Sequence, residues 1–182
     1  MINVGTKRMD FFKVSEEFSD KEKLLILKAC IDKRDLKIYE YSDWLYNKIN
    51  EMLNYNEMDV ERPVSFIDSL YDIFTKDFKY SGKVYRGFID DYDYESDEEL
   101  KSFSTNLIRA SDFAHCARSY GDGLVIEQTV ICAFNLTAFL EHLCELDVRY
   151  LSICEEYFSE KEVLCCIQHN YRILYKNGER VI

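Results

Sequence analysis

The sequence is poor in residues that interrupt regular structure: its 182 residues include one proline and six glycines. This scarcity argues against a linker-rich or disordered chain, and 47% hydrophobic residues are enough for a core. There are three histidines, and none of the seven cysteines forms a C-x-x-C pair, so spacing assembles no zinc site. We expect reduced, mostly buried thiols, no metal, and one domain over residues 1–182.

Long apolar runs and clusters of positive charge are also missing. No segment approaches the roughly 18 apolar residues that span a membrane, and no apolar stretch near the N-terminus is typical of a signal peptide. The formal net charge of −11 repels phosphate backbones and anionic membranes. We therefore expect a cytoplasmic protein, in the producing cell or in a target cell after delivery, without a membrane or nucleic-acid partner.

The first 80 residues have the pattern of helices. Ser19 and Glu22 have the spacing of a capping box, which predicts that a helix begins there. Apolar residues recur at helical intervals over 42–53, and Pro63 is placed to begin a third helix. These apolar stripes predict that the helices pack into a core.

From residue 81 the pattern changes to strands with short connections. The predicted strands span 83–89, 101–106, 124–134, 149–153, 162–168 and 171–174. Helices are predicted over 110–120 and 137–146, and Asn177-Gly178 predicts a two-residue hairpin turn. Helices followed mostly by strands predict an α+β fold rather than a parallel α/β sheet.

Two short motifs lie on predicted strands. In Tyr85-Arg86-Gly87, an arginine in mid-strand must direct its guanidinium to a partner, although alone it also fits a packed strand residue. In the second motif, Ser104 and Thr105 place hydroxyl groups on a short strand, which alone also fits an edge strand. Neither motif by itself indicates a function.

The third motif, Glu160-Lys161-Glu162, enters an apolar strand. Side chains two residues apart on a strand project to the same face, so the two carboxylates are predicted to lie close together. Paired carboxylates repel each other and reduce stability unless another group uses them. The pair is therefore a candidate catalytic site.

In this order, the three motifs resemble the R-S-E class of mono-ADP-ribosyltransferases, which includes cholera-toxin-like and clostridial binary-toxin-like enzymes and phage and effector relatives. The resemblance runs from Lys83 to Cys166, and Asn106 stands where the family usually has a second serine. It implies the ADP-ribosyltransferase fold, with two roughly perpendicular antiparallel sheets and an N-terminal helical region. Residues 1–80 would form that region and 81–182 a mostly β catalytic core.

The resemblance also implies NAD as the co-substrate and no metal. Arg86 matches the family arginine that clamps an NAD phosphate, a task suited to a planar guanidinium. Gly87, Ser104 and Thr105 match neighbouring family positions, and Ser104 would hydrogen-bond the final glutamate of the third motif. Tyr85 would line the NAD site or, alternatively, belong to the core.

The implied catalytic roles belong to the two glutamates. Glu162 would bind the ribose 2′-hydroxyl and stabilise the positive charge that develops as nicotinamide leaves. Glu160 would orient or deprotonate the acceptor. The preceding segment, 154–159, would touch the target, with Tyr157 or Phe158 as the aromatic contact.

The resemblance favours an arginine of a target protein as acceptor, because glutamate at the first position of E-x-E goes with arginine acceptors. An acidic enzyme also attracts an arginine-rich surface. One alternative is modification of a nucleic-acid base, for which only Lys161, Arg149 and His169 supply positive charge near Glu160. Others are simple NAD hydrolysis and a catalytically inactive interaction module of the same fold. A toxin or effector role is expected, and the sequence leaves the target open.

Overall fold

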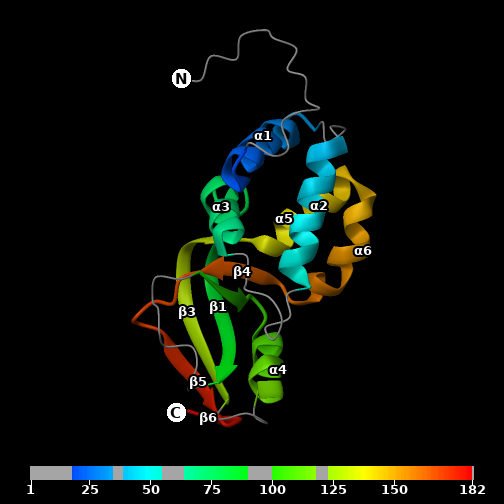
Figure 1. The fold of residues 1–182 in the computed structure, drawn as a ribbon. Helices are drawn as coiled ribbons and strands as arrows, with labels where there is room; N and C mark the ends of the chain where they lie inside the picture. The colour runs from blue at the N-terminus through cyan, green and yellow to red at the C-terminus, as the bar shows by residue number, and fades with distance from the viewer. Residues whose placement is uncertain (1–17, 35–38, 55–63, 90–99, 118–122, 182) are drawn as a thin grey trace.

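The computed structural model describes residues 18–34, 39–54, 64–89, 100–117 and 123–181. Figure 1 shows an antiparallel sheet at one end of the molecule and most of the helices at the other. Helix α4 (Leu107–Ala117) lies beside the sheet. The predicted α+β class is therefore confirmed.

The N-terminal helices form where the sequence predicts them. They are α1 (Asp20–Asp32), α2 (Tyr39–Leu53) and α3 (Val64–Phe74). The capping box is confirmed, because the Ser19 amide donates to Glu22 Oε2 at 2.9 Å and the Glu22 amide donates to Ser19 Oγ at 3.4 Å. Pro63 lies outside the described residues.

The helical core also draws on the second half of the chain. Helix α5 (Leu136–Leu146), the 3₁₀ helix η2 (Val148–Tyr150), helix α6 (Leu151–Cys154) and the 3₁₀ helix η3 (Glu155–Ser159) follow β3. Buried residues of α1, α3 and α5, among them Leu24, Phe66 and Phe139, belong to one apolar cluster. The helical part of the fold is thus not confined to the first 80 residues.

The strand predicted over 149–153 is wrong, because these residues form η2 and α6. The side chain of Asp147 accepts a hydrogen bond from the Arg149 amide at 3.0 Å, which caps the helical turn. Tyr150 is fully buried, and its hydroxyl donates to the Ser42 carbonyl at 3.2 Å. Capping and burial against α2 here outweigh the weak strand preference of the segment.

The remaining predicted strands are confirmed, with small shifts at their ends. They are β1 (Lys79–Ile89), β2 (Lys101–Ser104), β3 (Gly123–Phe134), β4 (Glu162–Cys165) and β5 (Arg172–Lys176). A further short strand that was not predicted, β6 (Glu179–Arg180), follows β5. The predicted hairpin turn joins β5 to β6, with positive φ at both Asn177 (52°) and Gly178 (78°).

All six strands belong to one hydrogen-bonded sheet of order β1-β2-β4-β3-β5-β6, with β1 also paired to β3. Tyr85 opposite Ser104 joins β1 to β2, and Phe134 opposite Leu164 joins β3 to β4. In Figure 1, β4 runs across β1 and β3. The structure therefore has one hydrogen-bonded sheet where the resemblance implied two, and β2 and β4 cross over its longer strands.

An apolar layer separates the β2–β4 pair from β1 and β3. Val84 and Phe88 of β1 pack there with Phe103 of β2 and Val163 of β4. The opposite face of β1 carries Gly87 against α4, where an added Cβ would lie 1.8 Å from the Ala110 carbonyl oxygen and 2.7 Å from the Ala114 amide nitrogen. The missing side chain therefore allows α4 to approach the sheet. Within the described ranges, no helix has the length and apolar character needed to cross a bilayer.

Candidate active site

The two glutamates of the third motif lie on either side of a sharp turn. Glu160 follows η3 with helical backbone angles, Lys161 has a positive φ of 52°, and Glu162 begins β4. The reason given from the sequence for their proximity is therefore wrong, because Glu160 precedes the strand. A left-handed conformation costs a non-glycine residue roughly 1–2 kcal/mol, so surrounding contacts must hold this turn.

The two carboxylates nevertheless interact. The pKa of Glu160 is raised from its ordinary value of 4.5 to about 7. Burial is the main cause and the negative charge of Glu162 adds to it, whereas the positive charge of Arg109 acts in the opposite direction. Glu160 is thus divided between its protonated and ionised forms near neutral pH.

Glu162 is held at the junction of three elements. Its amide donates a 2.7 Å hydrogen bond to Oγ1 of Thr137 in the first turn of α5. On the sheet it lies directly opposite Ser104 of β2. Its position is therefore fixed by α5 on one side and by β2 on the other.

Ser104 and Thr105 hold the turn that contains the glutamates. Ser104, which is 6% exposed, donates from Oγ to the Glu160 carbonyl oxygen at 2.5 Å and accepts from the Asn106 amide at 3.0 Å. The Thr105 amide donates to the Lys161 carbonyl oxygen at 3.0 Å. The structure thus gives Ser104 the backbone of the first glutamate as partner, whereas the resemblance implied the second glutamate.

Arg86 contacts β2 from the side of the apolar layer. Its Nη1 donates to the Ser102 carbonyl oxygen at 2.6 Å, and its guanidinium lies 5.9 Å from the centre of the Phe88 ring. Because Phe103 points into the apolar layer, strand alternation places the Ser104 side chain on the other face of β2. The structure therefore brings together the serine and glutamate motifs and places Arg86 across the strand from them.

Two other predicted NAD-site residues lie on the α4 side of β1. Tyr85 packs against a small apolar cluster that includes Ala110 and Val125. Gly87 gives space to the backbone of α4, as described above. This packing agrees with the alternative interpretation of Tyr85 as a core residue.

The aromatic residues expected to touch the target are half-buried against the helical core. Tyr157 and Phe158 both pack against that core, and the Tyr157 hydroxyl hydrogen-bonds the carbonyl of Leu53, the last residue of α2. Tyr157 therefore ties η3 to α2. The exposed side chains of η3 are Glu155, Glu156 and Ser159.

Sequence reasoning misses Arg109. It lies in the first turn of α4, and its Nε donates to the Ser159 carbonyl oxygen at 3.3 Å. Its charge also favours the ionised form of Glu160, the next residue along the chain from Ser159. The contact joins residues 50 positions apart, so no local pattern could have revealed it.

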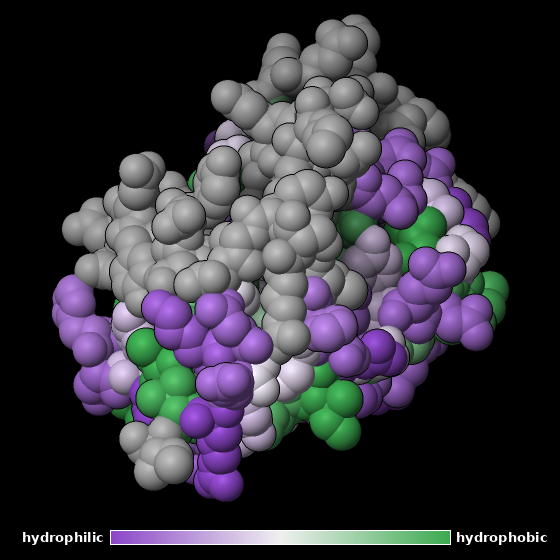
Figure 2. Space-filling model, turned by 90° about the horizontal axis from the view of Figure 1, so that it is seen from below, coloured by the Kyte–Doolittle hydropathy of each residue, from purple (hydrophilic) through white to green (hydrophobic). Residues whose placement is uncertain are grey.

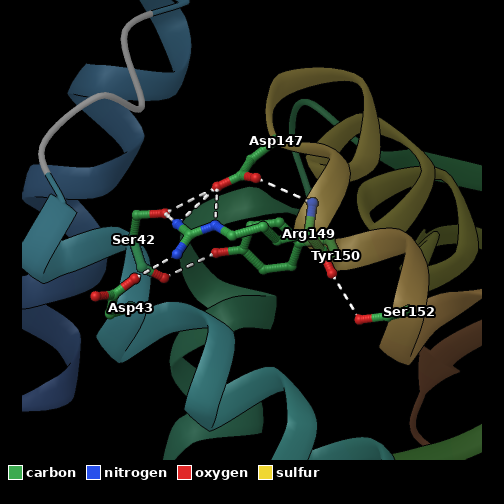
Figure 3. Close-up of polar contacts among 6 residues, drawn as sticks. All are labelled: Ser42, Asp43, Asp147, Arg149, Tyr150 and Ser152. Carbon is green, nitrogen blue, oxygen red and sulfur yellow. Dashed lines mark hydrogen bonds and ion pairs between the residues drawn. The ribbon is translucent and has the colours of Figure 1, made fainter.

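Arg149, considered as a basic residue near Glu160, instead belongs to a polar network between α2 and η2 (Figure 3). Its guanidinium donates to Asp43 Oδ1 at 2.6 Å, Ser42 Oγ at 2.7 Å and Asp147 Oδ2 at 2.9 Å. These hydrogen bonds raise the pKa of Arg149 and lower that of Asp147. The network joins α2 to η2, and α2 in turn contacts η3 through the Leu53 carbonyl.

A surface hollow of about 350 Å³ lies elsewhere, on the α4 side of the sheet. Its lining residues are Ser111, Asp112, Ala114, His115, Gly123, Val125, Tyr175 and Gly178. None of the predicted site residues lines it. Figure 2, which views the molecule from below, shows mostly hydrophilic described residues with separate hydrophobic patches. Single apolar side chains at a surface, such as the exposed Ile108 and Phe113 of α4, are common in proteins.

Comparison of the chain with family models, with curated proteins and with solved structures gave no match in any of the three.

Proposed function

We propose that the chain is an NAD-dependent mono-ADP-ribosyltransferase that releases nicotinamide and joins ADP-ribose to an arginine of a target protein. One observation carries the proposal: the hydrogen bond from Ser104 to the Glu160 backbone, with Glu162 directly opposite Ser104. It unites the serine and glutamate motifs, which are separated by more than 50 residues, in one polar site.

Glu162 has the place and charge that cleavage of NAD requires. Loss of nicotinamide develops positive charge on the ribose, as in glycoside hydrolysis. A carboxylate that is fixed before the reaction stabilises this charge without reorganisation. The α5 and β2 contacts fix the backbone from which the Glu162 carboxylate extends.

Glu160 has the properties of a general base for the acceptor. A base works best when its pKa lies near the working pH, and that of Glu160 is about 7. An arriving guanidinium brings positive charge next to the two carboxylates, which favours their ionised forms. The two glutamates thereby receive different roles in the same reaction.

Arg86 would bind a phosphate of NAD. Its Nη1 donates to the Ser102 carbonyl oxygen, and the planar fork of a guanidinium matches the geometry of phosphate oxygens. NAD would then extend past the end of β2, from Arg86 to Glu162. Within this proposal, β2–β4 and the crossing strands β1, β3, β5 and β6 correspond to the two sheets of the ADP-ribosyltransferase fold.

A protein acceptor is favoured over a nucleic-acid base. Arg149 is engaged by Asp43 and Asp147, and the net charge of −11 opposes a polyanion. The target would expose an arginine, and the reaction would take place in the cytoplasm of the producing cell or of a cell that receives the protein as a toxin or effector.

The acceptor is tested by incubating the purified chain with labelled NAD and cell lysate. We expect label in material that protease removes and nuclease does not. Glu155→Gln, which removes an exposed carboxylate from the neighbouring η3, serves as the control and should retain the label. Label that nuclease removes would establish modification of a nucleic-acid base. Release of nicotinamide without label in protein or nucleic acid would establish simple NAD hydrolysis. If neither labelled macromolecules nor free nicotinamide formed, the remaining alternative would be a catalytically inactive interaction module.

A further inference from the structure

We infer that Arg109 is a positioning residue of this site: it contacts the turn that carries Glu160 and supplies a positive charge that favours the ionised form of Glu160 beside Glu162. Its importance for catalysis rests on the proposed function. Its effect on Glu160 does not, and can be measured without any substrate.

The geometry connects Arg109 to the turn through the backbone. Its Nε donates to the Ser159 carbonyl oxygen at 3.3 Å, immediately before Glu160. Its Nη1 lies 3.8 Å from Asp112 Oδ2, one turn further along α4. These two contacts place the guanidinium between α4 and the residue that precedes Glu160.

The start of α4 is fixed to the same turn. The Asn106 side chain accepts a 2.9 Å hydrogen bond from the Ile108 amide, and the Asn106 amide donates to Ser104 Oγ. Ser104 in turn donates to the Glu160 carbonyl oxygen. A chain of hydrogen bonds thus connects the first turn of α4 to Glu160, and Arg109 extends from that turn.

Three influences act on the ionisation of Glu160. Glu162 disfavours ionisation of Glu160, and so does burial, whereas Arg109 favours it. The other titratable groups around the turn are Glu156 and Tyr157 on η3, Lys161 in the turn, Asp112 on α4, and Glu141 on α5, which lies 3.6 Å from Lys161. Among the described residues, Arg109 is the cation whose charge lowers the pKa of Glu160.

The direct test is NMR titration of the Glu160 side-chain carboxyl carbon in the wild-type chain, Arg109→Gln and Arg109→Lys. We expect the Glu160 pKa to rise in Arg109→Gln and to return toward the wild-type value in Arg109→Lys, which keeps the charge. Arg180→Gln, which removes an exposed positive charge from β6, is the matched control and should leave the titration unchanged. An unchanged Glu160 titration in Arg109→Gln would overturn the inference.

The pH dependence of transfer to free arginine extends the test to catalysis. We expect the rate of Arg109→Gln to fall roughly two- to tenfold at pH 6 and to approach the wild-type rate at pH 9, where the base is ionised in both proteins. If Arg109→Gln lost the same fraction of the transfer rate at pH 6 and at pH 9, Arg109 would not act through the ionisation of Glu160. If no protein turns over NAD while the titration shift is present, the positioning of Glu160 stands and the proposed function fails.

Discussion

The Ser104 hydroxyl donates a hydrogen bond of 2.5 Å to the carbonyl oxygen of Glu160, 56 residues further along the chain. The next residue repeats the connection, because the Thr105 amide donates to the carbonyl oxygen of Lys161. These two bonds fasten the end of β2 to a turn whose middle residue has a left-handed backbone. The serine motif therefore acts on the glutamates by fixing their backbone.

Ser104→Ala should destabilise the fold and displace Glu160. The change removes the donor to the Glu160 carbonyl and the acceptor of the Asn106 amide, in a site that is almost fully buried. We expect the free energy of unfolding to fall by about 2 kcal/mol, as measured by urea denaturation. Ser102→Ala, on the same strand, should cost about 0.5 kcal/mol or less. Equal denaturation midpoints for the two variants would show that the Ser104 hydrogen bonds do not hold the turn.

The raised pKa of Glu160 should make stability depend on pH. Between its ordinary value of 4.5 and about 7, the unfolded chain ionises this residue more readily than the folded one, so stability falls as pH rises through this range. Glu160→Gln should abolish this fall. At pH 8 we expect the variant to be more stable by about 1–2 kcal/mol, a value reduced for solvent screening, and at pH 4 the difference should vanish.

This pH effect is measured by denaturation of the wild-type chain, Glu160→Gln and Glu155→Gln across the range. Glu155 is exposed on the same 3₁₀ helix, so its variant controls for the loss of one negative charge. A stability gain in Glu160→Gln that is the same at pH 4 and pH 8 would contradict the assigned cause.

Gly87→Ala should disrupt the packing of α4. The new Cβ would meet backbone atoms of Ala110 and Ala114, which no side-chain rotation can relieve. We expect a loss of about 3 kcal/mol in the free energy of unfolding. Tyr85→Phe, on the same face of β1, adds no volume and should be close to neutral. If thermal unfolding of Gly87→Ala matched that of the wild-type chain, the close approach of α4 to β1 would be wrong.

Local signals account for most of the fold that the sequence predicted. The Ser19 capping box and the Asn177-Gly178 turn both depend on neighbouring residues, and both occur as expected. The failure at 149–153 has a tertiary cause, because Tyr150 is buried against α2 and Arg149 binds Asp43 of the same helix. Apolar and aromatic residues in a short segment fit either a strand or a buried helical turn, and only the distant partner decides.

The candidate site was predictable in its residues but not in its connections. Motif order identified Ser104, Glu160 and Glu162, and the structure places them together. The left-handed turn at Lys161 could not be foreseen, since lysine carries no preference for positive φ. The contact of Arg109 with the turn could not be predicted from the sequence, because it forms only where α4 packs against η3, a segment 50 residues away.

Release of nicotinamide from NAD by the purified chain tests the central claim most directly. The wild-type chain and Glu155→Gln should release it, and Glu162→Gln should release it on the order of 100- to 1,000-fold more slowly, because the charge that stabilises the departing state is lost. Glu160→Gln should keep residual release while losing transfer to free arginine, since water needs no help from Glu160 to be oriented as an acceptor. Full nicotinamide release by Glu162→Gln, or none by the wild-type chain, would contradict the assignment of this site as an ADP-ribosyltransferase centre.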